Sequence, residues 1–119
     1  MSKVEFKRGS TKPLRVILRD KKGPVDLTGA TVVFSMMGVK AVGVPTVAAR
    51  EAVVEQTTVG GKIKDKGVVR YDWDPPEVDI EALNDGEWLV TFADGSTQKF
   101  PSREGDFRID IVADIRARP

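Results

Sequence analysis

Apolar residues in this chain fall mostly at every second position, and this spacing constrains the fold more than any other feature of the sequence. Leu14, Val16 and Leu18, for example, are separated by Arg15 and Ile17. Successive side chains of a β-strand point to opposite faces, so the spacing is that of a strand with one buried face. The same alternation covers residues 30–37, 67–73, 87–92 and 106–115, and weaker strand patterns cover 3–8 and 50–59. The sequence therefore predicts about seven short strands.

Helix has little room in this sequence. Only residues 76–85 could form one or two helical turns, with Pro76 at the start and Asp85-Gly86 at the end. Several short strands, regular turn residues and little helix are typical of a β-sandwich. We therefore expect an all-β fold, an antiparallel β-sandwich of about seven strands. Residues 1–119 are expected to form a single domain.

The inward positions of these strands predict the core. It should consist of Leu14, Val16, Leu18, Val32, Phe34, Tyr71, Trp73, Trp88, Val90, Phe92, Phe100, Phe107 and Ile109. Seven of these residues are aromatic, and their inward positions favour a core over an exposed platform for stacking.

The strongest local signal is a hairpin around Ala93-Asp94-Gly95. These residues fit a three-residue loop, a type I turn followed by Gly in the left-handed region. This loop length sets Trp88 opposite Phe100, so that the ring of Phe100 joins the buried face. A two-residue loop would put Phe100 on the other face.

The stretch Asp26-Leu27-Thr28-Gly29 looks a little like the Asp-Thr-Gly loop of aspartic proteases. Leu27 interrupts that motif, and the protease chemistry needs a second such loop to share one proton between two carboxylates. Asp is favoured at the first position of a type I turn and Gly at the last. We therefore interpret Asp26 and Gly29 as turn residues, with the Asp26 carboxylate accepting the Thr28 N–H.

Two absences limit the chemistry. The chain contains no His and no Cys, which removes the commonest general base, the commonest metal ligand and every thiolate nucleophile. We expect no enzymatic activity, no catalytic residues and no cofactor.

One acidic run could still hold a cation. It contains Asp72, Asp74, Glu77 and Asp79, whose oxygens are the ligand type that Ca²⁺ prefers. Pro76 stands near the point where a calcium-binding EF-hand loop needs Gly, which favours a solvated rim. The calcium site remains the alternative.

The charge balance argues against nucleic acid as a partner, and the lack of a long apolar stretch argues against a membrane. Lys plus Arg is 19 and Asp plus Glu is 18, a net charge of +1, and the charges are interspersed. Gly60-Gly61-Lys62 lacks the spacing of a phosphate-binding loop. No stretch approaches the roughly 18 apolar residues of a membrane span. Residues 1–12 have no apolar h-region, so we expect synthesis in the cytoplasm.

The segment 37–50 is too apolar for a plain solvated loop and too rich in Gly and Pro for a central strand. Val39, Val42, Val44 and Val47 either cover one end of the core or form a surface that a partner protein buries. We take these four valines as the candidate partner interface.

Several pieces resemble a known family. They are "TKPLRVILRDKKGPVDLTGATVVFSM", "GVVRYDW", "WLVTFADGSTQKFPS" and "FRIDIV". They are similar to the immunoglobulin-like N-terminal domain of tailed-phage baseplate upper proteins and to related small phage and prophage tail proteins. The resemblance spans residues 10 to 112, although the segment 39–55 is longer and more apolar than the usual connection.

The resemblance implies an immunoglobulin-like sandwich and a structural role in the virion. The chain would be an adaptor or connector in the tail tip or baseplate, joining the tail to receptor-binding proteins or fibres. Its partners would be other virion proteins, and several copies would sit in a symmetric assembly. The alternative is a sandwich module that binds carbohydrate or a cell surface.

Overall fold

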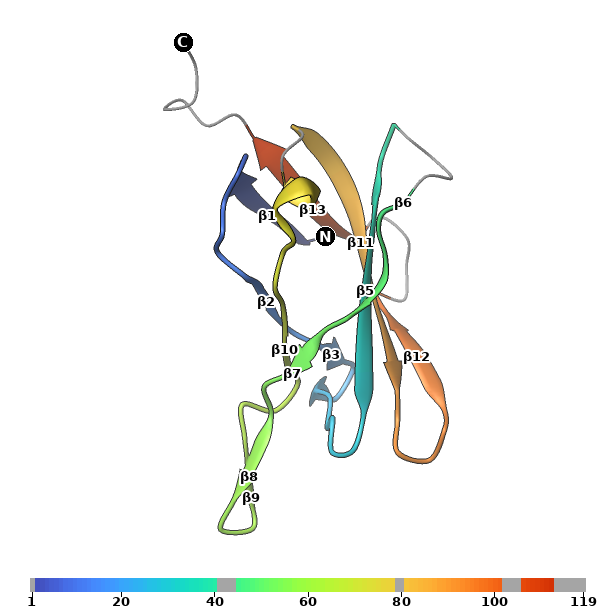
Figure 1. The fold of residues 1–119 in the computed structure, drawn as a ribbon. Helices are drawn as coiled ribbons and strands as arrows, with labels where there is room; N and C mark the ends of the chain where they lie inside the picture. Colours follow the sequence, from blue (N-terminus) through green and yellow to red (C-terminus); the bar gives the residue numbers. More distant parts are fainter. Residues whose placement is uncertain (1, 41–44, 79–80, 102–105, 113–119) are drawn as a thin grey trace.

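The computed structural model describes residues 2–40, 45–78, 81–101 and 106–112. The chain forms an all-β sandwich of a large and a small sheet (Figure 1). The large sheet has the order β1 (Ser2–Lys7), β13 (Phe107–Val112), β11 (Ala82–Thr91), β5 (Thr31–Gly38) and β6 (Pro45–Glu51), and β12 (Thr97–Phe100) also pairs with β11. The small sheet has the order β2 (Leu14–Ile17), β10 (Val68–Tyr71) and β7 (Val53–Val54).

Two short ribbons and one helical turn complete the described structure. β3 (Arg19–Asp20) pairs with β4 (Gly23–Pro24), and β8 (Thr57–Val59) pairs with β9 (Lys62–Lys64). Residues Pro75–Val78 form the 3-10 turn η1. No helix in these described parts is long and apolar enough to cross a membrane.

The predicted all-β sandwich is confirmed, but the sheets are not wholly antiparallel. β1 pairs with β13 in parallel, with Val4 opposite Ile109 and Phe6 opposite Ile111. A tight hairpin forces neighbouring strands to run antiparallel, whereas strands far apart in sequence can pair either way. Nearly the whole chain lies between β1 and β13, so no turn dictates their direction.

The predicted helix at 76–85 is wrong for its second half. Among the residues of this range that the structure describes, only those of η1 are helical, and Ala82–Asp85 belong to β11. The alternation continues through this part of the strand, but its inward positions carry Asn84 and Gly86. The Asn84 amide donates to the carbonyl of Ile109 (3.3 Å). Gly86 leaves room for the ring of Phe107, because a Cβ there would come within 2.8 Å of it.

The core lies between the two sheets and follows the predicted inward positions. Ten of the thirteen predicted residues are buried, and Val16, Trp73 and Phe92 are partly buried against them. Aromatic rings join the layers, since Phe34 packs on Trp88 of its own sheet (4.6 Å between centroids) and on Tyr71 of the small sheet (4.9 Å). Buried residues beyond the prediction are Phe6, Val25, Leu27, Met36, Val47, Ala52, Val69, Val78 and Ile111.

The predicted hairpin register is confirmed. Trp88 lies opposite Phe100, and the Phe92 N–H donates to the Ser96 carbonyl (2.8 Å). Gly95 has φ 88°, the left-handed conformation that the three-residue loop requires. Ser96 donates its hydroxyl and its N–H to Asp94, which lowers the pKa of that carboxyl.

Candidate protein-interaction surface

One hairpin projects from the sandwich, and we call it the arm (residues 57–64, β8 and β9). It points away from both sheets at one end of the molecule (Figure 1). Every residue of the arm is exposed. Gly60 and Gly61 close it with φ of 59° and 78°, as a two-residue turn with two positive φ angles requires. An isolated two-stranded ribbon is only marginally stable in water, so this arm gains little by itself.

The base of the arm is held by the side chain of Gln56. Its Oε1 accepts the N–H of Leu27 (2.8 Å) and the N–H of Gly67 (3.2 Å). Its Nε2 donates to Asp26 Oδ1 (2.8 Å) and to Thr28 Oγ1 (3.1 Å). The amide thus uses both donors and both acceptor positions. We call this set of bonds the clamp, and it ties the start and the end of the arm to the 25–30 loop.

The clamp depends on a close backbone approach at Gly67. This residue has φ +80°, and a Cβ there would lie 2.7 Å from the carbonyl oxygen of Leu18. The Leu18 N–H donates to the Gly67 carbonyl (2.8 Å). Only glycine combines this conformation with this contact without strain.

Asp26 is a structural residue of the clamp. The predicted bond from the Thr28 N–H is present (3.0 Å), and the Thr28 hydroxyl also donates to the same oxygen (2.6 Å). Together with the Gln56 amide, these bonds lower the pKa of Asp26 to about 2, because hydrogen bonds to a carboxylate favour its charged form.

The predicted turn lies one residue later than expected. The Ala30 N–H donates to the Leu27 carbonyl (3.0 Å), so the backbone turn runs from Leu27 to Ala30. Gly29 is its third residue with φ +70°, the position at which type II turns require glycine. Asp26 stands outside this turn, and its carboxylate accepts bonds from Thr28 and Gln56.

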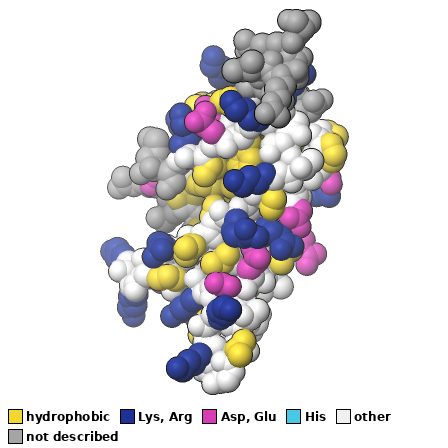
Figure 2. Space-filling model, turned by 90° about the vertical axis from the view of Figure 1, so that its left-hand side faces the viewer, with side chains coloured by type: hydrophobic (Ala, Val, Ile, Leu, Met, Phe, Trp, Pro, Cys, Tyr) yellow, Lys and Arg dark blue, Asp and Glu magenta, His cyan; other side chains and the backbone are white. Residues whose placement is uncertain are grey.

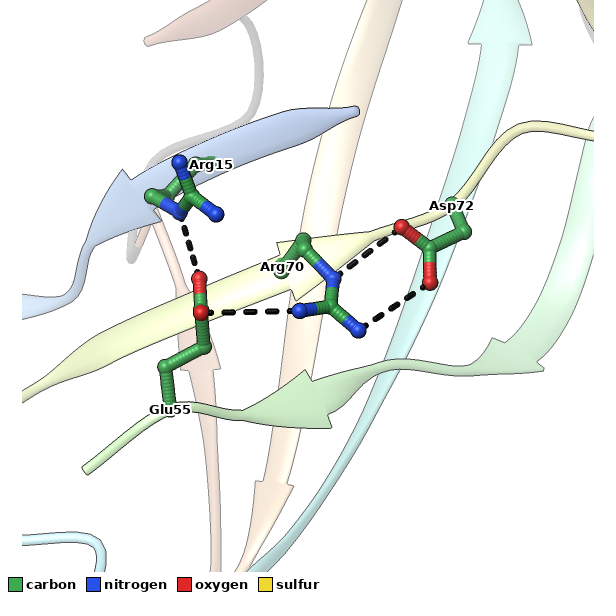
Figure 3. A network of polar contacts seen from close by, with 4 residues as sticks. All are labelled: Arg15, Glu55, Arg70 and Asp72. Atoms are coloured by element: carbon green, nitrogen blue, oxygen red, sulfur yellow. Dashed lines mark hydrogen bonds and ion pairs between the residues drawn. The ribbon is translucent and has the colours of Figure 1, made fainter. Parts of the chain in front are cut away.

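The outer face of the small sheet carries a row of charges (Figure 3). Arg15 pairs with Glu55, and Arg70 joins Glu55 (3.5 Å) to Asp72 (3.0 Å). The Glu55 carboxylate raises the pKa of the Arg15 guanidinium above its ordinary value. Arg15 and Arg70 lie on the outward side of β2 and β10, and each has an acidic partner. Arg19 is exposed in β3.

Apolar residues flank these charges. Ile17 and Val68 pair across β2 and β10, and Val53 pairs with Arg70 from β7. A hollow of about 480 Å³ is lined by Arg15, Val16, Ile17, Glu55, Asp65 and Val68. Since Asp65 follows β9 directly, the hollow lies where the arm leaves the sheet. We call Arg15, Ile17, Val53, Glu55, Asp65, Val68, Arg70 and Asp72 the outer face. Figure 2 shows this side of the molecule, where apolar and charged side chains are interspersed.

The acidic run is occupied by protein contacts. Asp72 pairs with Arg70, and Asp74 pairs with Arg50 (2.8 Å). Glu77 is buried and accepts a hydrogen bond from the Tyr71 hydroxyl (2.8 Å). The pKa of Tyr71 is raised, mainly because its hydroxyl is buried and also because of this bond to Glu77.

The backbone also uses Glu77. It accepts the Asp74 N–H (2.8 Å), which fixes the start of η1. Asp79 lies outside the described residues, and within them no group of three or more His, Cys, Asp or Glu could hold a metal.

The four valines of the predicted interface have different positions. Val47 is buried in β6 opposite Met36 and belongs to the core, so it offers no surface to a partner. The reason is that β6 pairs with β5 and turns Val47 inward. Val39 is partly buried, and its N–H donates to the Leu83 carbonyl (2.9 Å). Val42 and Val44 lie outside the described residues.

No model of a known protein family matches this chain, and a search of curated proteins also finds no match. The surface must therefore be interpreted from its residues. Sequence reasoning missed Gln56 and the arm, although Gly-Gly between two short polar–apolar runs is itself a hairpin signal.

Proposed function

We propose that this chain is a structural protein of a tailed-phage virion, an adaptor or connector in the tail tip or baseplate. It would join the tail to receptor-binding proteins or fibres and would be present in several copies. Three stretches within the resembling pieces support this proposal, residues 25–32, 67–71 and 92–101. They form the turn before β5 with the start of that strand, the whole of β10, and the loop and second strand of the β11–β12 hairpin. These stretches make the frame of the sandwich.

The distribution of side chains carries the proposal. Gln56, Asn84 and Glu77, polar side chains that are buried or partly buried, use their amide or carboxylate groups to bond to the backbone. Exposed large apolar residues gather on the arm and the outer face, which is how a protein that works through protein contacts uses its surface.

The aromatic side chains give less support to a carbohydrate-binding module. All five Phe, both Trp and the single Tyr lie in the described residues, and each is buried or partly buried. A sugar-binding face needs exposed rings on which the sugar can stack. The resemblance and the inward rings therefore favour the virion role.

The test is the protein content of purified phage particles produced by the strain that encodes this chain. Quantitative mass spectrometry should find the chain in a fixed ratio to the other tail proteins, and deletion of its gene should give particles with incomplete tail tips. Particles that lack the chain, combined with glycan binding by the isolated protein, would support the carbohydrate module instead.

A further inference from the structure

The exposed large apolar residues of the described chain are four, and all lie on the arm or the outer face. Val59 (65% exposed) and Ile63 (40%) belong to the arm, while Ile17 (45%) and Val53 (41%) belong to the outer face. The arm extends away from the sheets and leaves the outer face of its own chain uncovered (Figure 1). Both apolar groups therefore remain in water in a single chain.

We propose that two copies of this chain associate by reciprocal arm exchange. The arm of each copy lies across the outer face of the other with the face of the ribbon that carries Val59, Lys62 and Lys64, which cross-strand pairing places on one side. Val59 then covers Ile17 and Val53 of the opposite chain, while Ile63 lies on the other face of the ribbon, opposite Thr58. The same surfaces meet on both sides, which is the arrangement of a closed two-fold dimer. The inference concerns the isolated chain and holds whether or not the protein is part of a virion.

Charge complementarity supports a second copy as the occupant. The arm carries Lys62 and Lys64, which form no ion pair within the described residues. The outer face carries the carboxylates of Glu55, Asp65 and Asp72 against the guanidinium groups of Arg15 and Arg70. A basic arm thus meets a face with one more negative than positive charge.

The clamp makes the arm suitable for docking. Gln56 fixes both ends of the arm to the 25–30 loop, so the direction of the arm is set before association. A prearranged element loses less conformational freedom on binding than a loose loop. Contact with a second chain would also cover a ribbon that is marginal alone.

The first test is the mass of the purified chain in solution as a function of concentration. Analytical ultracentrifugation should find a monomer–dimer equilibrium. The variant Val59→Ser should weaken the dimer about tenfold, because it removes the apolar contact of both arms. Thr97→Ser/Lys99→Ala, on the exposed part of β12, is the control and should leave the dimer unchanged. A wild-type chain that stays monomeric up to about 1 mM overturns the proposal.

The second test uses the absence of cysteine. Chains carrying Val59→Cys and chains carrying Ile17→Cys are mixed and oxidised, so that a mixed disulfide can form only between two copies. The mixture should give the mixed disulfide much faster than the control mixture of Val59→Cys with Thr97→Cys. Equal rates in the two mixtures would show that the arm does not lie on the outer face, and would overturn the proposal.

The third test concerns charge. Lys62→Glu/Lys64→Glu should weaken the dimer, whereas Lys21→Glu/Lys22→Glu, which changes the net charge equally in the exposed β3–β4 turn, should not. An equal effect of both variants would mean that only net charge matters, and it would contradict the arm contact.

Discussion

Glu55 and Gln56 are neighbours in sequence and have side chains of the same length and shape. One ends in a charged carboxylate and the other in a neutral amide, and the two point to different parts of the structure. Glu55 points to the outer face and joins Arg15 to Arg70 in water. Gln56 points to the clamp and bonds two backbone N–H groups, the Asp26 carboxylate and the Thr28 hydroxyl. Exposed ion pairs contribute little to stability, while an unsatisfied backbone donor is costly. The neutral residue should therefore hold the fold, and the charged one should shape the surface.

The largest expected effect lies where the clamp meets the backbone. Gly67→Ala should lower the free energy of unfolding by about 3 kcal/mol. About 1–2 kcal/mol of this comes from placing a residue with a Cβ in the left-handed conformation, and the rest comes from displacing the Leu18 carbonyl that the new Cβ would touch. Gly61→Ala is the matched control, because Gly61 has nearly the same φ (78°) and nothing within 4 Å of its Cβ position. Urea unfolding measures both. Equal losses in the two variants would mean that the contact at Gly67 has no cost.

Removing the clamp amide should have the next largest effect. Gln56→Ala leaves the N–H groups of Leu27 and Gly67 without their protein acceptor, and we expect a loss of about 1–3 kcal/mol. Hydrogen exchange should speed up at these two amides before it does in the core strands. A stability unchanged within about 0.5 kcal/mol would show that water replaces Gln56 fully.

Asp26 should make part of the clamp dependent on pH. Its folded pKa of about 2 lies below the ordinary value of 3.8. A depressed folded pKa adds stability above the unfolded pKa, and this stability is lost as the pH falls through the folded value. Wild type should therefore be more stable than Asp26→Asn at pH 5, and the difference should shrink between pH 4 and pH 2. Urea unfolding at each pH measures it, and a constant difference would contradict the clamp bonding.

The smallest effect should come from Glu55. Glu55→Gln removes its charge, and since Arg15 and Glu55 are partly exposed, we expect a loss of about 0–1 kcal/mol that disappears at high salt. Thermal unfolding at low and high ionic strength checks this. A loss larger than that of Gln56→Ala would reverse the comparison.

The sandwich could be predicted from the sequence because a strand with one buried face alternates apolar and polar residues. Phe34, Trp88 and Ile109 lie inward as their spacing indicates. The first half of β11 was missed because Asn84 and Gly86 occupy inward positions that alternation expects to be apolar. The direction of β1 was missed because it depends on a partner at the far end of the chain.

The candidate surface was less predictable than the core. Val47 was assigned to an interface because its flanking Gly and Pro suggest a loop, yet pairing with β5 turns it inward. Gln56 leaves no trace, because an amide that bonds to distant backbone looks the same in sequence as a solvated one. All residues of the arm are exposed. The arm therefore has no buried face, and the alternation of apolar and polar residues could not predict its position.

The parallel pairing of β1 with β13 has a mechanical consequence. The two strands lie side by side over six paired positions, and their outer ends point in opposite directions along the chain. Tension applied through residues before β1 and after β13 would pull these strands past each other lengthwise. The hydrogen bonds between them would then share the load and have to break together, whereas a hairpin pulled from its open end loses them one by one. The sandwich should accordingly resist stretching along this axis, and single-molecule pulling from the two ends should require more force than pulling across β11 and β12.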